Sequence, residues 1–453
     1  MSLAPGSTSA AASTAKPPSQ LHRTPHPAAA QETLTRRARG TRVAAASVLV
    51  GFADALAAPE AVASLLGAGH RVTAFARRGR PVALRRLREV AIVEVTAPEH
   101  DLAACAEEVA ALAAAHELTM PLDDPAVLVA DRGLPAEAPV AGPRGVQARM
   151  ALDKRVQLRA AQAAGFAVAP WVELTSDGAG VAAVNGHRPT PGAGEPHALE
   201  LPTGWEFPAV LKPALAAEEH EGRLRRLAPR PVATEAEAQA LLRTWGAATP
   251  ALVQRWVAGT GAGIFGIADD EGIHHLSAHR RVRMMNPAGS GSSACASAPV
   301  PTELVGPVQR LLGEAGWRGM FMVELLRAGE EWWFMELNGR PWGSLALARR
   351  VGYEYPAWAA ARALDHAAPL PPSPPFEELT CRHVGRELMH MLFVLRGPRG
   401  HVGEWPGRRA TLRAMLASGS PTAWYNLQPG TRGLFLEDTW RTVATQTWGR
   451  RGA

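Results

Sequence analysis

The chain has 453 residues, of which 47% are hydrophobic and 20% charged, an ordinary composition for a folded protein of roughly two to four domains or subdomains. A run of about 18 apolar residues uninterrupted by charges, Gly or Pro does not occur, which excludes a membrane-spanning helix and hence a membrane partner. The net charge of +6 favours an anionic ligand, and nucleic acid is disfavoured because no stacking or zinc module accompanies the charge.

Residues 1–41 are rich in Ala, Ser, Thr, Pro and Arg and lack the apolar core of a secretory signal. They predict a disordered leader, or a start codon assigned too far upstream. The three cysteines, Cys105, Cys295 and Cys381, are scattered and form no CxxC pair. This spacing argues against a disulfide framework or a zinc site, and it favours a reducing compartment. We therefore expect a cytoplasmic protein.

Lysine is rare in this chain. Among the 48 Lys and Arg residues, three are lysines: Lys16, Lys154 and Lys212. A lysine retained in such an arginine-rich sequence indicates a position that needs a compact ammonium, as a phosphate oxygen does, rather than a planar guanidinium. Lys154 and Lys212 lie in the predicted folded region and are therefore candidate ligand-binding residues.

Residues 42–145 alternate short apolar runs with helical segments. The predicted strands are Ala44–Phe52, His70–Ala76, Val90–Thr96 and Leu118–Leu122, and the predicted helices are Pro59–Ala68 and Asp101–His116. Strands alternating with helices are typical of a parallel α/β unit, so this region is predicted to be a small Rossmann-like domain. It has no GxGxxG motif, and a dinucleotide site is therefore not predicted.

Residues 146–368 mix helical and hairpin patterns. A helix is predicted over Gln147–Ala164, and residues 175–205 are predicted to be a surface loop or a poorly ordered insertion. Further strands and hairpins follow at Phe207–Pro213, Ala251–Ala258, Ile264–Ala268, His274–Arg283, Gly319–Leu326 and Glu331–Asn338, with helices at Thr234–Trp245, Val305–Gly316 and Ser344–Val351 and a Gly/Ser-rich loop at Asn286–Ser293. A Pro-rich linker begins the last region, 369–453, which is predicted to be a C-terminal helical extension.

The strongest chemical signal lies in the predicted hairpin of Gly319–Asn338, where two apolar strands flank a five-residue turn, R-A-G-E-E. With Glu324 opposite Phe334, strand alternation places Glu324, Glu336 and Asn338 on one side of the hairpin. The other side is predicted to carry the apolar residues Val323, Leu325, Met335 and Leu337.

Two carboxylates buried side by side are costly unless a cation neutralises them, and oxygen ligands of this kind suit Mg²⁺. Glu324, Glu336 and Asn338 are therefore predicted metal ligands. Arg340 follows two residues later and is a candidate clamp for a phosphate or an acyl phosphate.

The pattern E-x₁₁-E-x-N-x-R formed by these residues resembles the metal-binding end of ATP-grasp enzymes. The form E-L-N-G-R-P-W-G-S-L is most similar to carboxylate–amine ligases of the carbamoyl-phosphate-synthetase-like branch, and the resemblance covers roughly residues 45–365. It implies an ATP-grasp fold, of mixed α/β and α+β class, behind the Rossmann-like domain of residues 42–145. The ATP-grasp domain would be 146–368, with a lid at about 166–258 and a catalytic base at about 259–368.

Further motifs follow in the family's order. M-A-L-D-K ends at Lys154, and F-P-A-V-L-K-P-A contains Lys212, so the resemblance implies that both lysines contact the ATP phosphates. L-V-Q-R-W-V-A-G-T-G-A-G resembles the hinge strand and implies adenine contacts at Gln254, Trp256 and Val257. The resemblance implies ATP and Mg²⁺ as cofactors, with two Mg²⁺ ions and Mn²⁺ as the alternative metal.

S-A-H-R-R-V-R-M resembles the segment that supplies basic residues near the γ-phosphate. Arg281 and Arg283 alternate with Val282, so we expect them to share one strand face with His279 and, together with Arg340, to be catalytic. We expect His279 to be structural. The sequence departs from the family pattern in three places: Gly222 alone remains of a glycine-rich phosphate loop, Gln254 stands where Glu is common, and Gly261 replaces an acidic ribose contact.

The resemblance implies a ligase that activates a carboxylate as an acyl phosphate and joins it to an amine, releasing ADP and phosphate. Small-molecule carboxylates and amines are the expected partners, and homodimer formation is left open. The alternatives are other ATP-grasp chemistry (carboxylation, carbamoylation or thioester formation) and a non-catalytic ATP-binding regulatory module.

Overall fold

The computed structural model describes residues 45–174, 199, 201–246, 249–289, 291–398, 403–417 and 421–447. The predicted leader of residues 1–41 lies outside these ranges, as does most of the predicted loop of residues 175–205. Within the described ranges, no helix has both the length and the apolar character needed to cross a membrane.

Four parallel strands form the first sheet, in the order β3-β2-β1-β4. Its strands are β1 (Ser47–Gly51), β2 (Arg71–Arg77), β3 (Val90–Val95) and β4 (Leu118–Pro121), and its helices are α2 (Ala58–Gly67), the 3₁₀ turn η1 (Ala83–Arg86), α3 (Leu102–Ala113) and α4 (Asp124–Gly133). The parallel α/β arrangement predicted for this region is confirmed. Helix α4 was not predicted; Asp123 caps it by accepting a hydrogen bond from the Ala126 amide at 2.9 Å.

The second sheet is antiparallel and has the order β5-β10-β6-β9. It contains β5 (Trp171–Leu174), β6 (Ala209–Pro213), β9 (Arg230–Val232) and β10 (Ala251–Arg255), accompanied by helix α7 (Glu235–Trp245) and a small hairpin of β7 (Glu218–His220) and β8 (Arg223–Arg225). Helices α5 (Val146–Leu152) and α6 (Lys154–Ala163) precede it. The single helix predicted over Gln147–Ala164 is therefore interrupted at Asp153, whose side chain caps α6 by accepting from the Arg155 amide.

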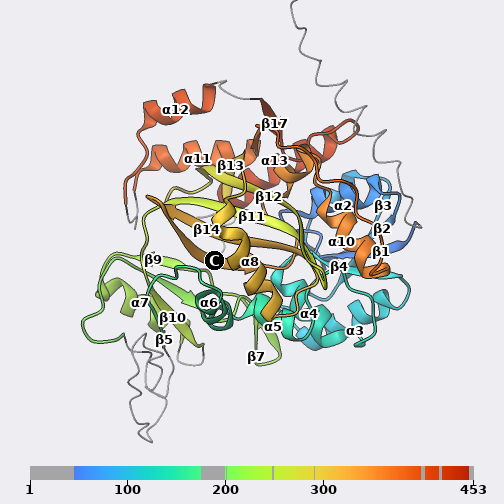
Figure 1. Ribbon diagram of the computed structural model, residues 1–453, viewed down its shortest axis with the longest axis horizontal. Coiled ribbons are helices and arrows are strands. Elements are labelled where there is room, and N and C mark those ends of the chain that lie inside the picture. The colour runs from blue at the N-terminus through green and yellow to red at the C-terminus, as the bar shows by residue number, and fades with distance from the viewer. Residues whose placement is uncertain are drawn as a thin grey trace, which may run out of the picture. The chain divides into compact units, whose positions relative to one another are not determined.

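The third sheet has seven strands in the order β15-β14-β11-β12-β13-β16-β17 (Figure 1). These are β11 (Thr260–Asp269), β12 (Gly272–Met284), β13 (Ser292–Ala298), β14 (Gly319–Ala328), β15 (Glu331–Asn338), β16 (Thr380–Arg382) and β17 (Thr422–Trp424). The helices of this region are α8 (Thr302–Glu314), α9 (Leu345–Arg350), α10 (Tyr355–Leu364), α11 (Val384–Arg396), α12 (Arg408–Leu416) and α13 (Arg432–Thr447). The C-terminal region therefore adds two strands to this sheet as well as helices.

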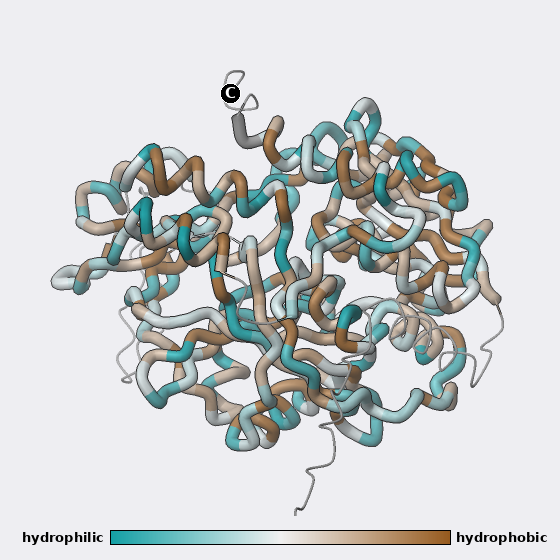
Figure 2. Tube along the Cα trace, turned by 90° about the horizontal axis from the view of Figure 1, so that it is seen from above, coloured by the Kyte–Doolittle hydropathy of each residue, from teal (hydrophilic) through white to brown (hydrophobic). Residues whose placement is uncertain are grey.

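Apolar side chains cover both faces of the third sheet. Ile264 and Val323 belong to one buried cluster, and Phe265 and Met322 belong to another that also includes Val48 of the first sheet. Short hydrophobic and hydrophilic stretches alternate along the chain (Figure 2), as expected for elements with one buried face. The first and third sheets therefore share one continuous core.

Strand β13 and helix α10 were not predicted. The β13 sequence, S-S-A-C-A-S-A, lacks the β-branched and aromatic residues that mark strands, so it was partly assigned to a loop. Its pairing with β12 on one side and β16 on the other determines its conformation. Context from the rest of the sheet therefore overrides the weak local preference of this segment.

Glu60 joins three separate parts of the chain. It lies in α2, is 3% exposed, and accepts hydrogen bonds from Arg350 of α9 at 2.8 and 3.1 Å. Arg349 donates to it as well, and the Asn426 amide from the C-terminal region donates at 2.8 Å. Burial raises the pKa of Glu60, but the charges of the two arginines and these hydrogen bonds outweigh it and lower the pKa to about 2.

We expect Glu60→Gln to lower the free energy of unfolding by about 3 kcal/mol at pH 7, because it leaves two buried arginines without their shared carboxylate. The folded-state pKa of Glu60 is depressed, so its stabilisation is complete above about pH 4.5 and is lost as the pH falls towards 2. The difference between wild type and variant should therefore shrink by more than half between pH 7 and pH 3. Urea unfolding at both pH values measures it.

Glu89→Gln is the matched control, because Glu89 is exposed and, among the described residues, has no ion-pair partner. That variant should differ little from wild type at either pH. A Glu60→Gln effect that is independent of pH would show that the carboxylate charge is not what stabilises this junction.

Candidate active site

The two predicted metal-binding glutamates are direct neighbours. Strands β14 and β15 form a hairpin in which Glu324 pairs with Glu336, with an irregularity between Glu324 and Leu325. The turn is shorter than predicted, since Ala328 already pairs with Glu331. The predicted register, with Glu324 opposite Phe334, is wrong by two positions: the shorter turn shifts the pairing by one, and Met335, an extra residue in β15, shifts it by another.

This bulge changes which side chains share a face. Phe334, not Met335, joins Val323 and Leu325 in the buried cluster, because one inserted residue resets the alternation of the strand. Glu324 and Glu336 still lie side by side on the opposite face. The convergence predicted for them is therefore present, although it arises from a different register.

Asn338 and the backbone around it are held in place. The Asn338 side-chain amide donates to Glu336 Oε1 at 2.9 Å. Between them, Leu337 forms two hydrogen bonds with the buried side chain of Gln157 from α6: its amide donates to Oε1 at 2.9 Å and its carbonyl accepts from Nε2 at 3.1 Å. Gln157 was not singled out from the sequence, and it fixes the strand that carries Glu336 and Asn338.

Both predicted lysines lie near Glu336, and Lys212 lies near Glu324 as well. Lys212 on β6 is 6% exposed, and burial lowers its pKa to about 8, although the nearby Glu336 and Glu324 oppose this shift. Lys154 begins α6, and its amide donates to Ala214 just after β6. Burial also lowers the pKa of Lys154, with Glu336 and Asp124 acting in the opposite direction. The two lysines therefore come from different elements to one acidic centre.

Arg281 reaches Glu324 across a neighbouring strand. Its guanidinium forms an ion pair with Glu324 Oε1. A Cβ added at Gly261 would lie 2.4 Å from Arg281 Cδ, so the arginine side chain passes directly over this glycine. Gly261 replaces an acidic residue of the family pattern, and here its missing side chain opens the path from β12 to β14.

Arg283 does not join Arg281. Arg281 pairs with Cys295 and Arg283 with Ala294, so Val282 is an extra residue in β12 and the predicted shared face is wrong. The Arg283 side chain instead donates to Glu387 of α11 at 2.9 and 3.1 Å. Glu387 also accepts from Arg382 and Ser293. In this structure the predicted catalytic residue Arg283 is part of a buried ion-pair cluster.

His279 is 2% exposed, and its ring packs edge-on against Phe265. Both ring nitrogens are buried and lack a hydrogen-bond partner among the described residues. Burial, aided by the charge of Arg281, lowers its pKa to about 3. A neutral histidine packed in this way fits the structural role expected for it.

Arg340 forms an ion pair that the sequence did not predict. It donates to both carboxylate oxygens of Asp124, at 2.9 and 3.2 Å, and Asp124 is the first residue of α4. Arg226 lies 3.7 Å from the same carboxylate. Asp124 lies next to Asp123, the cap of α4, and a D-D-P sequence after an apolar strand was the signal that could have identified this helix start.

The predicted adenine-contacting residues lie at the end of β10 and just beyond it. Gln254 is buried, and its side-chain amide donates to the Ala169 carbonyl at 3.1 Å. The Trp256 amide donates to the Pro208 carbonyl at 3.1 Å, and Val257 follows, partly buried. These two hydrogen bonds connect the end of β10 to the segments that precede β5 and β6.

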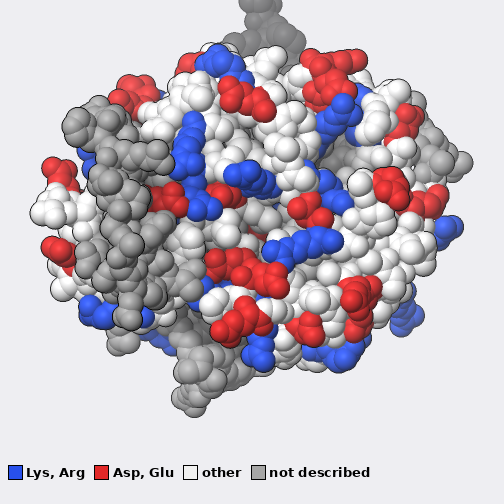
Figure 3. All heavy atoms as spheres, turned by 90° about the horizontal axis from the view of Figure 1, so that it is seen from below, with Lys and Arg blue, Asp and Glu red and all other residues white. Residues whose placement is uncertain are grey.

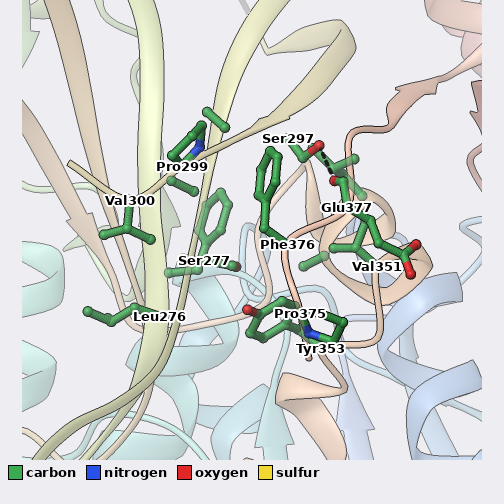
Figure 4. A pocket seen from close by; sticks show the side chains of 15 residues that line it. Leu276, Ser277, Ser297, Pro299, Val300, Val351, Tyr353, Pro375, Phe376 and Glu377 are labelled. Carbon is green, nitrogen blue, oxygen red and sulfur yellow. Dashed lines mark hydrogen bonds between the residues drawn. The ribbon is translucent and has the colours of Figure 1, made fainter. Parts of the chain in front are cut away.

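A separate cavity of about 350 Å³ lies between β12, β13 and α9 (Figure 4). It is mostly apolar, and Pro375 and Phe376 from the Pro-rich linker contribute to its wall. Its lining includes none of the predicted site residues. Acidic and basic side chains are intermixed on the face drawn in Figure 3, so this face presents no field of a single sign to a nucleic acid.

The carboxylate pair is suited to a divalent cation. Burial and the neighbouring charge of Glu336 raise the pKa of Glu324, with Arg281 and Lys212 opposing. Two carboxylates and one amide oxygen converge there from adjacent strand positions, and oxygen ligands of this kind are what Mg²⁺ prefers. Glu324, Glu336 and Asn338 therefore fit the metal role expected for them.

No family model and no curated protein sequence matches this chain. Several solved structures do resemble it. The L-amino acid ligase from Bacillus licheniformis superposes with a TM-score of 0.52 at 16% identity, over 72% of this chain and 75% of that one. N5-carboxyaminoimidazole ribonucleotide synthetase in complex with ADP gives 0.52 at 12% identity, over 83% and 97%. Pyruvate carboxylase from Rhizobium etli gives 0.52 at 17%, over 74% of this chain and 30% of that one.

At such low identities these similarities establish the fold and leave the reaction open. The parallel first sheet, the antiparallel second sheet and the third sheet with its carboxylate hairpin together form the architecture that the sequence motifs predicted. This chain has the ATP-grasp fold.

Proposed function

We propose that the protein is an ATP- and Mg²⁺-dependent ligase that activates a carboxylate as an acyl phosphate and joins it to an amine. One observation carries the proposal: Lys154 and Lys212, two of the three lysines in the chain, lie near Glu336, which pairs with Glu324 in a partly buried hairpin. A site with two ammonium groups around a partly buried carboxylate pair is suited to a metal-bound polyphosphate.

Each residue has a distinct role in this proposal. Glu324, Glu336 and Asn338 would hold Mg²⁺, which supplies neutralisation of the phosphate charge when bound. Lys154 and Lys212 bind phosphate oxygens as compact ammonium groups. Gln254, Trp256 and Val257, where β10 ends, line the adenine site.

The reaction needs positioning and charge neutralisation more than covalent help from the protein. A substrate carboxylate attacks the γ-phosphorus of ATP, releasing ADP and forming an acyl phosphate. The amine then attacks the acyl carbon and releases phosphate. Arg281, lying across Gly261, stabilises charge on the transferring group. Arg340 is held by Asp124 and orients the first domain against the site.

Arg283 belongs to this proposal only indirectly, because its charge is already engaged by Glu387. We propose that it positions α11 beside the end of β12. The three cysteines are buried and free in the described structure, which supports the proposal of a reducing, cytoplasmic setting.

ADP release tests the proposed function. The full chain is incubated with Mg·ATP and pooled carboxylates, with or without pooled amines. We expect ADP in quantity only when both pools are present, because the acyl phosphate is consumed by the amine. ADP that needs bicarbonate or a thiol in place of the amine would indicate carboxylation or thioester chemistry. Tight Mg·ATP binding with no ADP under any condition would indicate a non-catalytic module.

Glu336→Gln should lower the rate of ADP formation by at least about 100-fold, because it removes a metal-binding charge. The thermal unfolding temperature without nucleotide should change little, since the shape of the side chain is retained. Glu331→Gln, at the exposed start of the same strand, is the matched control and should retain full activity. Equal activity of both variants would contradict the metal role of Glu336.

Lys212→Arg should lose at least about tenfold in kcat/KM for ATP although the charge is kept, because a buried planar guanidinium does not fit a site shaped for an ammonium. Lys212→Met, which removes the charge, is the comparison. We expect the two variants to be similarly impaired in steady-state kinetics. Near-wild-type activity of Lys212→Arg would show that charge alone suffices at this position.

A further inference from the structure

Arg386 is a cation of the C-terminal region that lies close to the proposed active site. It belongs to the first turn of α11, and Figure 1 shows this helix beside β13. The Arg386 guanidinium donates to the Ser292 carbonyl, at the start of β13, at 3.0 Å. A Cβ added at Gly291 would lie 2.7 Å from Arg386 Nη1, so the guanidinium is held against the backbone there.

Arg386 forms no ion pair with a carboxylate among the described residues. The Ser292 carbonyl is the one hydrogen-bond acceptor of its guanidinium there. Two neighbouring arginines, Arg283 and Arg382, do form ion pairs, and both of them pair with Glu387. Asp438 on α13 attracts the Arg386 charge, but its direct contacts are with His383 and Asn426. A guanidinium offers five N–H donors, so most of those on Arg386 remain unused.

Arg386 lies on the same side of the third sheet as Arg281. Arg281 pairs with Cys295 in the strand register, and both arginines act electrostatically on the Cys295 thiol. Burial holds the pKa of Arg386 below its ordinary value, and the charge of Arg281 acts in the same direction. The Nε atom of Arg281 is also buried without an acceptor. Arg281 therefore links Glu324 to the part of β13 where Arg386 is bound, and both cations have unused donors.

Arg386 is partly buried, and a guanidinium without a carboxylate partner beside a second arginine attracts an anion that offers oxygen acceptors. The γ-phosphate does not fill this need at Arg386, because Lys154, Lys212 and the carboxylate pair place the phosphates at β6, β14 and β15. The reacting carboxylate does not fill it either, because it must reach the γ-phosphorus to attack it. The reactant that is left to supply an anion at Arg386 is the amine.

Resting on the proposed function, we infer that the amine substrate carries an anionic group, a carboxylate or a phosphate, and that Arg386 binds it with help from Arg281. The C-terminal region then forms part of the substrate site. Specificity for the amine is set by the distance between its nitrogen, which attacks the acyl phosphate near Glu324, and its anionic group.

The test compares Arg386→Gln with Arg396→Gln, a matched control at the exposed end of the same helix that lacks an ion pair within the described ranges. The amine pools contain amino acids, their amides, aminoalkyl phosphates and the matching amino alcohols. We expect wild type and the control to use the carboxylate or the phosphate members. Arg386→Gln should raise KM for that amine about ten- to a hundredfold while KM for ATP changes less than about twofold.

Two further variants separate binding from folding. Arg386→Lys should recover part of the loss, because it keeps the charge. Gly291→Ala leaves α11 unchanged but places a methyl group 2.7 Å from Arg386 Nη1, which must then move. This variant should also raise KM for the amine. Preference of wild type for the uncharged amines, or equal KM values for Arg386→Gln and Arg396→Gln, would overturn the inference.

If no pool yields ADP, that result counts against the proposed function and not against the anion site. A binding measurement then tests the anion site directly. With Mg²⁺ and a non-hydrolysable ATP analogue in the nucleotide site, inorganic phosphate and acetate are titrated during thermal unfolding. Wild type and Arg396→Gln should be stabilised by one of these anions and Arg386→Gln should not. Equal stabilisation of all three proteins would refute the anion site.

Discussion

The side-by-side placement of the partly buried Glu324 and Glu336 is the constraint on which the rest of the site depends. Two carboxylates on paired strand positions repel each other, and their desolvation adds to the cost. The surrounding structure brings positive charge to them from three directions: Lys154 from α6, Lys212 from β6 and Arg281 from β12. The sheets and helices that carry these cations must therefore meet at one place, and the ATP-grasp fold provides that meeting point.

Residue types and their order predicted much of this arrangement. The acidic hairpin and the parallel first sheet follow from local patterns, and the two lysine motifs were identified by their order in the family resemblance. The scarcity of lysine added independent weight, since a compositional bias that spares two residues indicates a specific need at each. The convergence of Glu324, Glu336 and Asn338 was predicted, and the structure brings these three residues together.

What the sequence did not predict depends on contacts between distant segments. Single extra residues at Met335 and Val282 shift strand register, and periodicity alone does not reveal such bulges. The Arg340–Asp124 ion pair joins residues 216 positions apart. Arg283 was expected beside Arg281, but a glutamate from α11 holds it elsewhere. Each error concerns the partner of a side chain, which a single sequence does not specify.

The C-terminal strands also have a consequence for the sheet they join. Without β16, the strand β13 would lie at the edge of the third sheet and present a short, uncharged run of Ala, Ser and Cys with unpaired backbone groups. Such an edge is a template for pairing with another chain. The strands β16 and β17 have three residues each, so the final edge offers few free backbone groups. The C-terminal region therefore replaces a seven-residue edge by one of three residues, which is a poorer template for pairing with another chain.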